Sequence, residues 1–156
     1  MMTPQQTRAN TTANDATPFG HLPPDASGHF LLYFYAAVHR LIAYASRLDH
    51  AAGAPAGQAL AEHPFLASYH AEIRAALPAG LDDASARDWW QQVIGAWESH
   101  VAARLPLRET THLNIAFDGR LAILLAGMAD IDTRLGTLFA QLQAPLGQRR
   151  PSLETI

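Results

Sequence analysis

Hydrophobic residues recur along most of this chain at intervals of three and four positions, the spacing that places them on one face of an α-helix. The most apolar segment spans residues 28–48, where the polar strip contains only His39, Arg40, Ser46 and Arg47. A helix that is apolar most of the way round lies inside a bundle or against a partner. We expect residues 28–48 to form a core helix, with a partner-binding groove as the alternative.

Five further segments show the helical period. They predict a short helix over 58–62 and longer helices over 64–77, 86–105, 115–129 and 132–142. Their expected core positions are Leu66, Tyr69, Ile73, Leu77, Trp90, Val93, Trp97, Val101, Leu105, Phe117, Leu121, Leu124, Leu125, Met128, Leu135, Leu138, Phe139 and Leu142. No segment alternates with period two, which is the strand signal. The sequence therefore predicts an all-α fold, a bundle of five or six helices with a disordered N-terminal tail.

Polar residues at the expected helix starts are candidate N-caps. The candidates are the stretch from Asp25 to Gly28, the capping-box pair Ser85 and Asp88, Asn114 and Asp132. Pro106 is expected to close the helix over 86–105 and to leave 107–112 as a loop, because proline interrupts a helix.

Polar, aperiodic sequence lies on both sides of the helical segments. Residues 1–24 are expected to form a disordered tail, up to about Thr17, and then an extended segment over 20–24. The helical domain is expected to span 25–146. Residues 147–156 are expected to be a linker toward a downstream domain outside this chain, because 151–156 resemble the start of another structural element.

Composition excludes several classes of function. The chain of 156 residues has a net charge of −3, which argues against a nucleic-acid partner because such proteins usually carry a basic surface. It has no cysteine and no lysine, which excludes disulfides, zinc–thiolate sites, a P-loop lysine and Schiff-base chemistry. The N-terminus lacks the apolar core of a signal peptide, and the longest apolar run is too short to cross a membrane. We expect a cytoplasmic protein without a membrane partner.

Candidate chemistry is sparse. Among the eight histidines, only Glu109 and His112 have a metal-ligand spacing, and Pro64 breaks any continuous helix between His63 and His70. No serine-nucleophile or nucleotide-binding motif is present. We expect no catalytic residue, no metal site and no cofactor, and we interpret the chain as a non-enzyme.

Three residues are predicted to contribute to an interaction surface. Trp89 lies at the edge of the apolar face of its helix, and Arg149 and Arg150 precede Pro151. Asp130, Asp132 and Arg134 together resemble a catalytic or metal-binding triplet. Capping through Asp132 and an i,i+4 pair between Asp130 and Arg134 explain them more simply.

The last 45 or so residues resemble a recurrent stretch of certain bacterial AAA+ ATPases. The matching pattern reads Phe117-Asp118-x-Arg120, then Asp130-Ile131-Asp132-x-Arg134-x-Gly136-x-Leu138-Phe139-Ala140-x-Leu142-Gln143, then Arg149-Arg150-Pro151-Ser152-Leu153. In that family a helical N-terminal region carries a Phe-Glu-Arg motif, an acidic elbow and an Arg-Arg-Pro exit before the ATPase module. This chain departs from the pattern by having Asp118-Gly119 and one extra residue before the elbow.

The resemblance implies a non-catalytic N-terminal domain that docks a protein partner or assists assembly of the ATPase ring. Some members of the family are encoded with phage-tail-like contractile injection systems. The ATPase module itself is expected downstream, because this chain has no Walker lysine. A different class of function stays open: a stand-alone helical bundle that binds a metal or a small hydrophobic ligand, a reading that the histidines and the aromatic helices favour.

Overall fold

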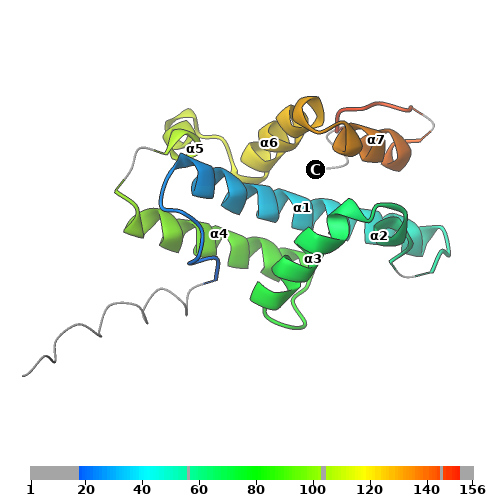
Figure 1. The fold of residues 1–156 in the computed structure, drawn as a ribbon, viewed down its shortest axis with the longest axis horizontal. Coiled ribbons are helices and arrows are strands. Elements are labelled where there is room, and N and C mark those ends of the chain that lie inside the picture. Colours follow the sequence, from blue (N-terminus) through cyan, green and yellow to red (C-terminus); the bar gives the residue numbers. More distant parts are fainter. Residues whose placement is uncertain (1–17, 56, 103–104, 145, 152–156) are drawn as a thin grey trace, which may run out of the picture.

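The computed structural model describes residues 18–55, 57–102, 105–144 and 146–151, and every regular element in them is helical (Figure 1). The all-α prediction is confirmed. The predicted disordered tail over 1–17 and the end of the predicted linker, 152–156, lie outside the described residues. The helices are α1 (Ala26–Ala51), α2 (Gln58–Glu62), α3 (Phe65–Ala76), α4 (Asp83–His100), α5 (Pro106–Glu109), α6 (Phe117–Ile131) and α7 (Thr133–Leu142), with a 3-10 helix, η1 (Thr110–Leu113), after α5.

The described residues form seven α-helices, one more than the five or six that the sequence predicts. The difference arises at 107–112, where the predicted loop is replaced by α5 and η1. Pro106 is the first residue of α5, a position where its missing N–H costs nothing. The preceding helix ends at His100, and Val101 has extended backbone, so Leu105 is buried in the connection and not on a helix.

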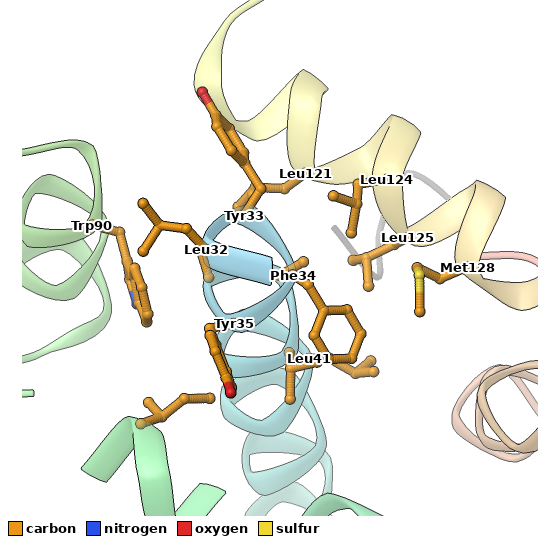
Figure 2. Packing of buried hydrophobic residues seen from close by; sticks show 14 of the residues in the cluster. Leu32, Tyr33, Phe34, Tyr35, Leu41, Trp90, Leu121, Leu124, Leu125 and Met128 are labelled. Carbon is orange, nitrogen blue, oxygen red and sulfur yellow. The ribbon is translucent and has the colours of Figure 1, made fainter. Parts of the chain in front are cut away.

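Helix α1 is the axis of the molecule, and α2, α3, α4, α5 and α6 all pack against it, whereas α7 packs on α6 (Figure 1). Seven consecutive residues, from Leu32 to Val38, are at most 7% exposed. Figure 2 shows Leu32 pointing toward Trp90 of α4, while Leu125 and Met128 of α6 approach α1 from another side. The predicted burial of this helix is confirmed. In the described part of the chain, no helix combines the length and apolar character that crossing a membrane requires.

The start of α1 is fixed by its cap and by a close backbone contact. Of the stretch 25–28 that was expected to cap this helix, Asp25 is the N-cap, and its carboxylate accepts hydrogen bonds from the backbone N–H groups of Ser27 and Gly28 at 2.9 and 3.0 Å. A Cβ atom at Gly28 would lie 1.9 Å from the carbonyl oxygen of Pro23. Glycine is therefore required here by the approach of the preceding segment, although it is a poor helix former.

Residues 18–21 form a turn, which differs from the extended backbone expected over 20–24. Phe19 has a φ of 61°, a conformation uncommon outside glycine, and Leu22 N–H donates to the Phe19 carbonyl at 3.0 Å. The turn places the Phe19 ring between the rings of Tyr35 and Trp90. The centroid of the Phe19 ring lies 5.1 Å from that of Tyr35 and 5.2 Å from that of Trp90. Burial of this ring, which is 4% exposed, offsets the strained backbone.

Two of the predicted caps are wrong and one more is confirmed. Helix α4 begins earlier than expected, at a cap formed by Asp82, which accepts from the Ser85 N–H at 2.8 Å. The residue before α6 is Ala116, which has no side-chain acceptor, while Asn114 has a φ of 53° in the preceding turn. Asp132 caps α7 as predicted, by accepting from the Arg134 N–H at 2.9 Å.

Candidate interaction surfaces

A small cleft opens between α1, α4 and the start of α6. Its apolar lining comes from three alanines, at 36, 43 and 86, and from Trp90, Phe117 and Leu121. Its polar lining consists of His39, Arg40, Arg47, Asp83 and Arg87. The alanines matter because short side chains on the facing sides of α1 and α4 leave the hollow unfilled. None of these polar residues was predicted from the sequence to belong to a site.

Two aspartates pair with the arginines of this cleft. Asp118, in the first turn of α6, lies 3.7 Å from Arg40 Nη1 and 3.1 Å from Arg87 Nη2. Arg47 pairs with Asp83 across α1 and α4. Arg40 and Arg87 thus lie on one carboxylate, and Arg47 lies on another. These side chains are between one-third and about one-half exposed, where an ion pair contributes only about 0–1 kcal/mol.

His39 is held in one tautomer by its neighbour. The indole N–H of Trp90 donates to His39 Nδ1 at 3.1 Å, so the neutral ring carries its hydrogen on Nε2. Burial lowers the pKa of His39, nearby Asp83 acts in the opposite direction, and His70 lowers it further. The neutral form and its bond to Trp90 are therefore favoured.

A second cluster of polar side chains is largely buried and connects α1 to α4 and α6. His29, 1% exposed, lies 2.7 Å from Glu98, and its ring stacks on Trp97 with centroids 5.7 Å apart. The Tyr33 hydroxyl lies 3.4 Å from Glu98 and accepts a hydrogen bond from Arg120 at 3.0 Å. Burial and the adjacent Glu98 carboxylate raise the pKa of Tyr33. These contacts connect α1 to α4 and α6, although Arg120 Nε is buried without a hydrogen-bond partner, and we interpret the network as structural.

Glu72 of α3 makes a similar but more exposed connection. Its carboxylate accepts a hydrogen bond from the Tyr35 hydroxyl at 2.6 Å and lies 3.2 Å from His21. Burial, and then the hydrogen bond to Glu72, raise the pKa of Tyr35. The Glu72 side chain is 40% exposed, compared with 15% for Glu98. The connection attaches α3 and the N-terminal turn to α1.

The residues after α7 fold back onto the α6–α7 elbow. The side-chain amide of Gln143, which is 7% exposed, lies within hydrogen-bond distance of three carbonyls: those of Phe139 at 3.1 Å, Gln148 at 3.1 Å and Arg150 at 2.8 Å. Arg149 packs against Gly136, where a Cβ atom would lie 3.4 Å from Arg149 Nε. We call this arrangement, formed by Gly136, Gln143 and residues 148–150, the C-terminal latch.

Both elbow aspartates are paired, but one partner differs from the prediction. Asp130 pairs with Arg150 at 3.0 Å and not with Arg134. Arg134 instead reaches Asp132, with Nη2 2.6 Å from the carboxylate, and its guanidinium lies 5.0 Å from the centre of the Phe65 ring. The predicted pair fails because α6 ends at Ile131 and Asp132 has extended backbone, so no continuous helix places Asp130 and Arg134 one turn apart.

The three residues predicted as an interaction surface do not lie together. Trp89 is half-buried on α4 and packs edge-on against Trp90 with ring centroids 4.9 Å apart. Arg149 and Arg150 belong to the C-terminal latch, beside α7, and α4 and α7 lie on opposite sides of α1 in Figure 1.

Glu98 and Glu72 had a sequence signal that was missed. Each continues an apolar stripe of its own helix: Glu98 follows Trp90 and Ile94 at intervals of four, and Glu72 lies three residues after Tyr69. A carboxylate in such a position predicts a buried hydrogen-bonding partner.

The histidines do not converge in the described part of the chain, where no group of three histidine, aspartate or glutamate residues could hold a metal ion. Glu109 and His112, the one pair with ligand spacing, are exposed at the end of α5 and in η1. His63 is buried and packs edge-on against Phe65 with ring centroids 6.1 Å apart. No family model, curated protein or solved structure matches the chain.

Proposed function

We propose that this chain is the non-catalytic N-terminal interaction domain of a bacterial AAA+ ATPase, of the type sometimes encoded with phage-tail-like contractile injection systems. It docks a protein partner or assists assembly of the ATPase ring. The proposal rests on the resemblance of the segment that begins at Phe117. No match to a known protein bears on it.

The observation that carries the proposal is that residues of the resembling pattern contact one another. Asp130 of the elbow pairs with Arg150 of the Arg-Arg-Pro exit, and Gly136 packs against Arg149. Gln143, the last residue of the middle part of the pattern, lies against the carbonyls of Gln148 and Arg150. The middle part of the pattern and the Arg-Arg of its exit, residues 130–150, thus lie in one packed unit, the elbow together with the C-terminal latch. The first part of the pattern lies apart from it, at the start of α6, where Asp118 contacts Arg40 and Arg87.

The latch has a mechanical role under this proposal. It fixes the direction in which the backbone leaves α7, so a module that follows Pro151 is tethered in a restricted orientation. A restricted tether loses less conformational entropy on docking than a flexible one. The ATPase chemistry belongs to that following module, since this chain offers no lysine for the nucleotide phosphates.

The first test is the coding sequence that follows the codon for Ile156. We expect a Walker motif within about one domain length, roughly 100–150 residues. A stop codon directly after Ile156 would contradict the proposal. ATP binding by this chain alone, measured by calorimetry, would contradict the assignment of a non-catalytic domain.

A further inference from the structure

We infer that the outward face of α6 packs against the same face of a second copy of this chain, in an antiparallel arrangement with its two-fold axis at Ile123. The inference goes beyond the proposed function and does not depend on it. A two-fold contact closes on itself and joins only two chains, so it differs from the contacts between neighbours around an ATPase ring.

Helix α6 is apolar on its outward side as well as its inward side. The inward side, which packs on α1 (Figure 1), buries Leu121, Leu124, Leu125 and Met128. Ile123 lies on the outward side and is 56% exposed. At about 100° per residue, the outer face of α6 comprises Ala116, Gly119, Ile123, Ala126, Gly127 and Asp130. Only Asp130 is charged, since Arg120 at the edge of the face turns inward to the Tyr33 hydroxyl. A helix that is apolar on both sides fits a partner on each.

The outer face has the same spacing in both directions from Ile123. Toward the N-terminus, Gly119 and Ala116 lie four and seven positions away, and toward the C-terminus Gly127 and Asp130 lie at the same two intervals. An antiparallel pair of α6 helices centred on Ile123 therefore sets each isoleucine against the other. It also sets the glycine before each isoleucine against the glycine after the other. A two-fold contact requires a self-complementary surface of this kind.

Gly127 is accounted for by this contact and not by the fold of the single chain. It lies inside α6, where glycine weakens a helix, and its φ is not positive. Nothing lies within 4 Å of a Cβ atom built on it. Glycine permits close approach of another backbone. The glycines on either side of Ile123 thus allow a second helix to approach closely enough for the two isoleucines to pack together.

The two ends of the outer face differ in electrostatic character. Helix α6 begins after Ala116 without a side-chain cap, so its first N–H groups present the positive end of the helix dipole. Asp130, which pairs with Arg150, lies at the other end and is 61% exposed. Antiparallel pairing brings Asp130 of each copy to the start of the other α6, whereas parallel pairing would bring the two Asp130 carboxylates together. The charges therefore complement a second copy in the antiparallel orientation.

The first measurement is sedimentation velocity on the whole chain, from about 10 μM to about 1 mM. One pair of helices buries less area than a standard protein interface, so we expect a weak dimer with a dissociation constant of roughly 100 μM. A chain that stays monomeric at the highest concentration, or that forms larger assemblies without a dimer, would overturn the inference.

A charge at the centre of the face tests the position of the contact. Ile123→Glu places two carboxylates against each other on the two-fold axis, and we expect it to weaken dimerisation at least tenfold. The matched variant Leu146→Glu adds the same charge at a large hydrophobic side chain that is 70% exposed and lies after α7. We expect it to dimerise as the unaltered chain does. Equal effects of the two substitutions would place the contact elsewhere.

Gly127→Ala separates dimerisation from folding. The added methyl group meets no atom of the same chain, so the substitution is expected to raise the free energy of unfolding in dilute solution. It is also expected to weaken the dimer about tenfold, because it keeps the second helix at a greater distance. Gly95→Ala, at an equally open position of α4, should raise stability in the same way and leave the dimer unchanged. Unchanged dimerisation by Gly127→Ala would contradict the close approach.

Crosslinking tests the orientation, because this chain has no cysteine of its own. The two thiols of Ile123→Cys would meet at the axis, and we expect diamide to join them in a disulfide-linked dimer. In the antiparallel pair the two thiols of Ala116→Cys would lie about 21 Å apart along the helices and should not be joined. A dimer linked through position 116, or none through position 123, would overturn the arrangement. These assays need neither ATP nor a following module, so their outcome and that of the AAA+ proposal are independent.

Discussion

Replacing Gly28 by alanine is expected to destabilise the protein, which is the opposite of the usual result in a helix. Replacing a helical glycine by alanine normally stabilises a protein by about 0.5–1 kcal/mol. At Gly28 the added methyl group would lie 1.9 Å from the Pro23 carbonyl oxygen, so the N-terminal turn has to move. We expect Gly28→Ala to lower the free energy of unfolding by about 1–3 kcal/mol, measured by urea denaturation.

Gly95 supplies the matched control for this substitution. It lies within α4, it is exposed, and nothing lies within 4 Å of a Cβ atom built on it. Gly95→Ala is expected to raise the free energy of unfolding by about 0.5–1 kcal/mol. Equal changes at the two glycines would show that the contact with Pro23 is absent in solution.

His39 makes stability depend on pH in a predictable direction. Its pKa in the folded protein lies below that of the unfolded chain, mainly because of burial. As the pH falls below the unfolded value of about 6.5, the unfolded chain takes up a proton that the folded protein resists, so stability falls until the folded pKa is passed. The stabilising neutral form is fully present only above that window.

The variant His39→Asn isolates this contribution. Asparagine does not titrate, and its side-chain oxygen can accept the Trp90 indole hydrogen bond in place of Nδ1. We expect its free energy of unfolding to fall less steeply than that of the unaltered chain between about pH 7.5 and pH 5. The pKa of His70 is also lowered, by burial and by Arg74, but it contributes to both proteins and cancels. Identical pH slopes would contradict the assignment.

At the scale of elements, the C-terminal latch depends on one buried amide. Gln143→Ala removes the group that contacts the carbonyls of Phe139, Gln148 and Arg150. We expect a loss of about 1–3 kcal/mol in the free energy of unfolding and faster hydrogen exchange at the Leu146 and Gly147 amides. Gln141→Ala, two residues earlier on the exposed face of α7, is the control and should change both quantities little. Unchanged exchange in Gln143→Ala would mean that the latch does not hold the segment.

The sequence predicted which segments are helical better than where they end. Asp132 was recognised as a cap, and Asp25 lies in the stretch 25–28 expected to cap the first helix, because aspartate is a preferred N-cap residue. The end of α4 was misplaced because Val101 and Leu105 continue the apolar stripe of that helix, yet Val101 is extended. Burial of an apolar residue does not require a helix, so periodicity alone overextends one.

At the scale of the whole molecule, the buried character of α1 followed from its composition, but its neighbours did not. Arg40, Arg87 and Asp118 come from three distant segments, and nothing in their local sequence indicates that they meet. The same holds for Asp130 and Arg150, which only the fold-back of the chain brings together. The cleft and the latch are therefore tertiary features that a single sequence does not reveal.

The all-round burial of residues 32–38 in α1 also limits how the gene can vary. Inserting or deleting one residue among 32–38 would rotate everything beyond it by about 100°, the angle between successive residues of an α-helix. Side chains that pack on α4 would then face α6 or α3, and no side of the segment 32–38 is exposed enough to tolerate the change. Descendants of this gene should accordingly differ in α1 by substitution alone, with changes of length confined to the connections between helices.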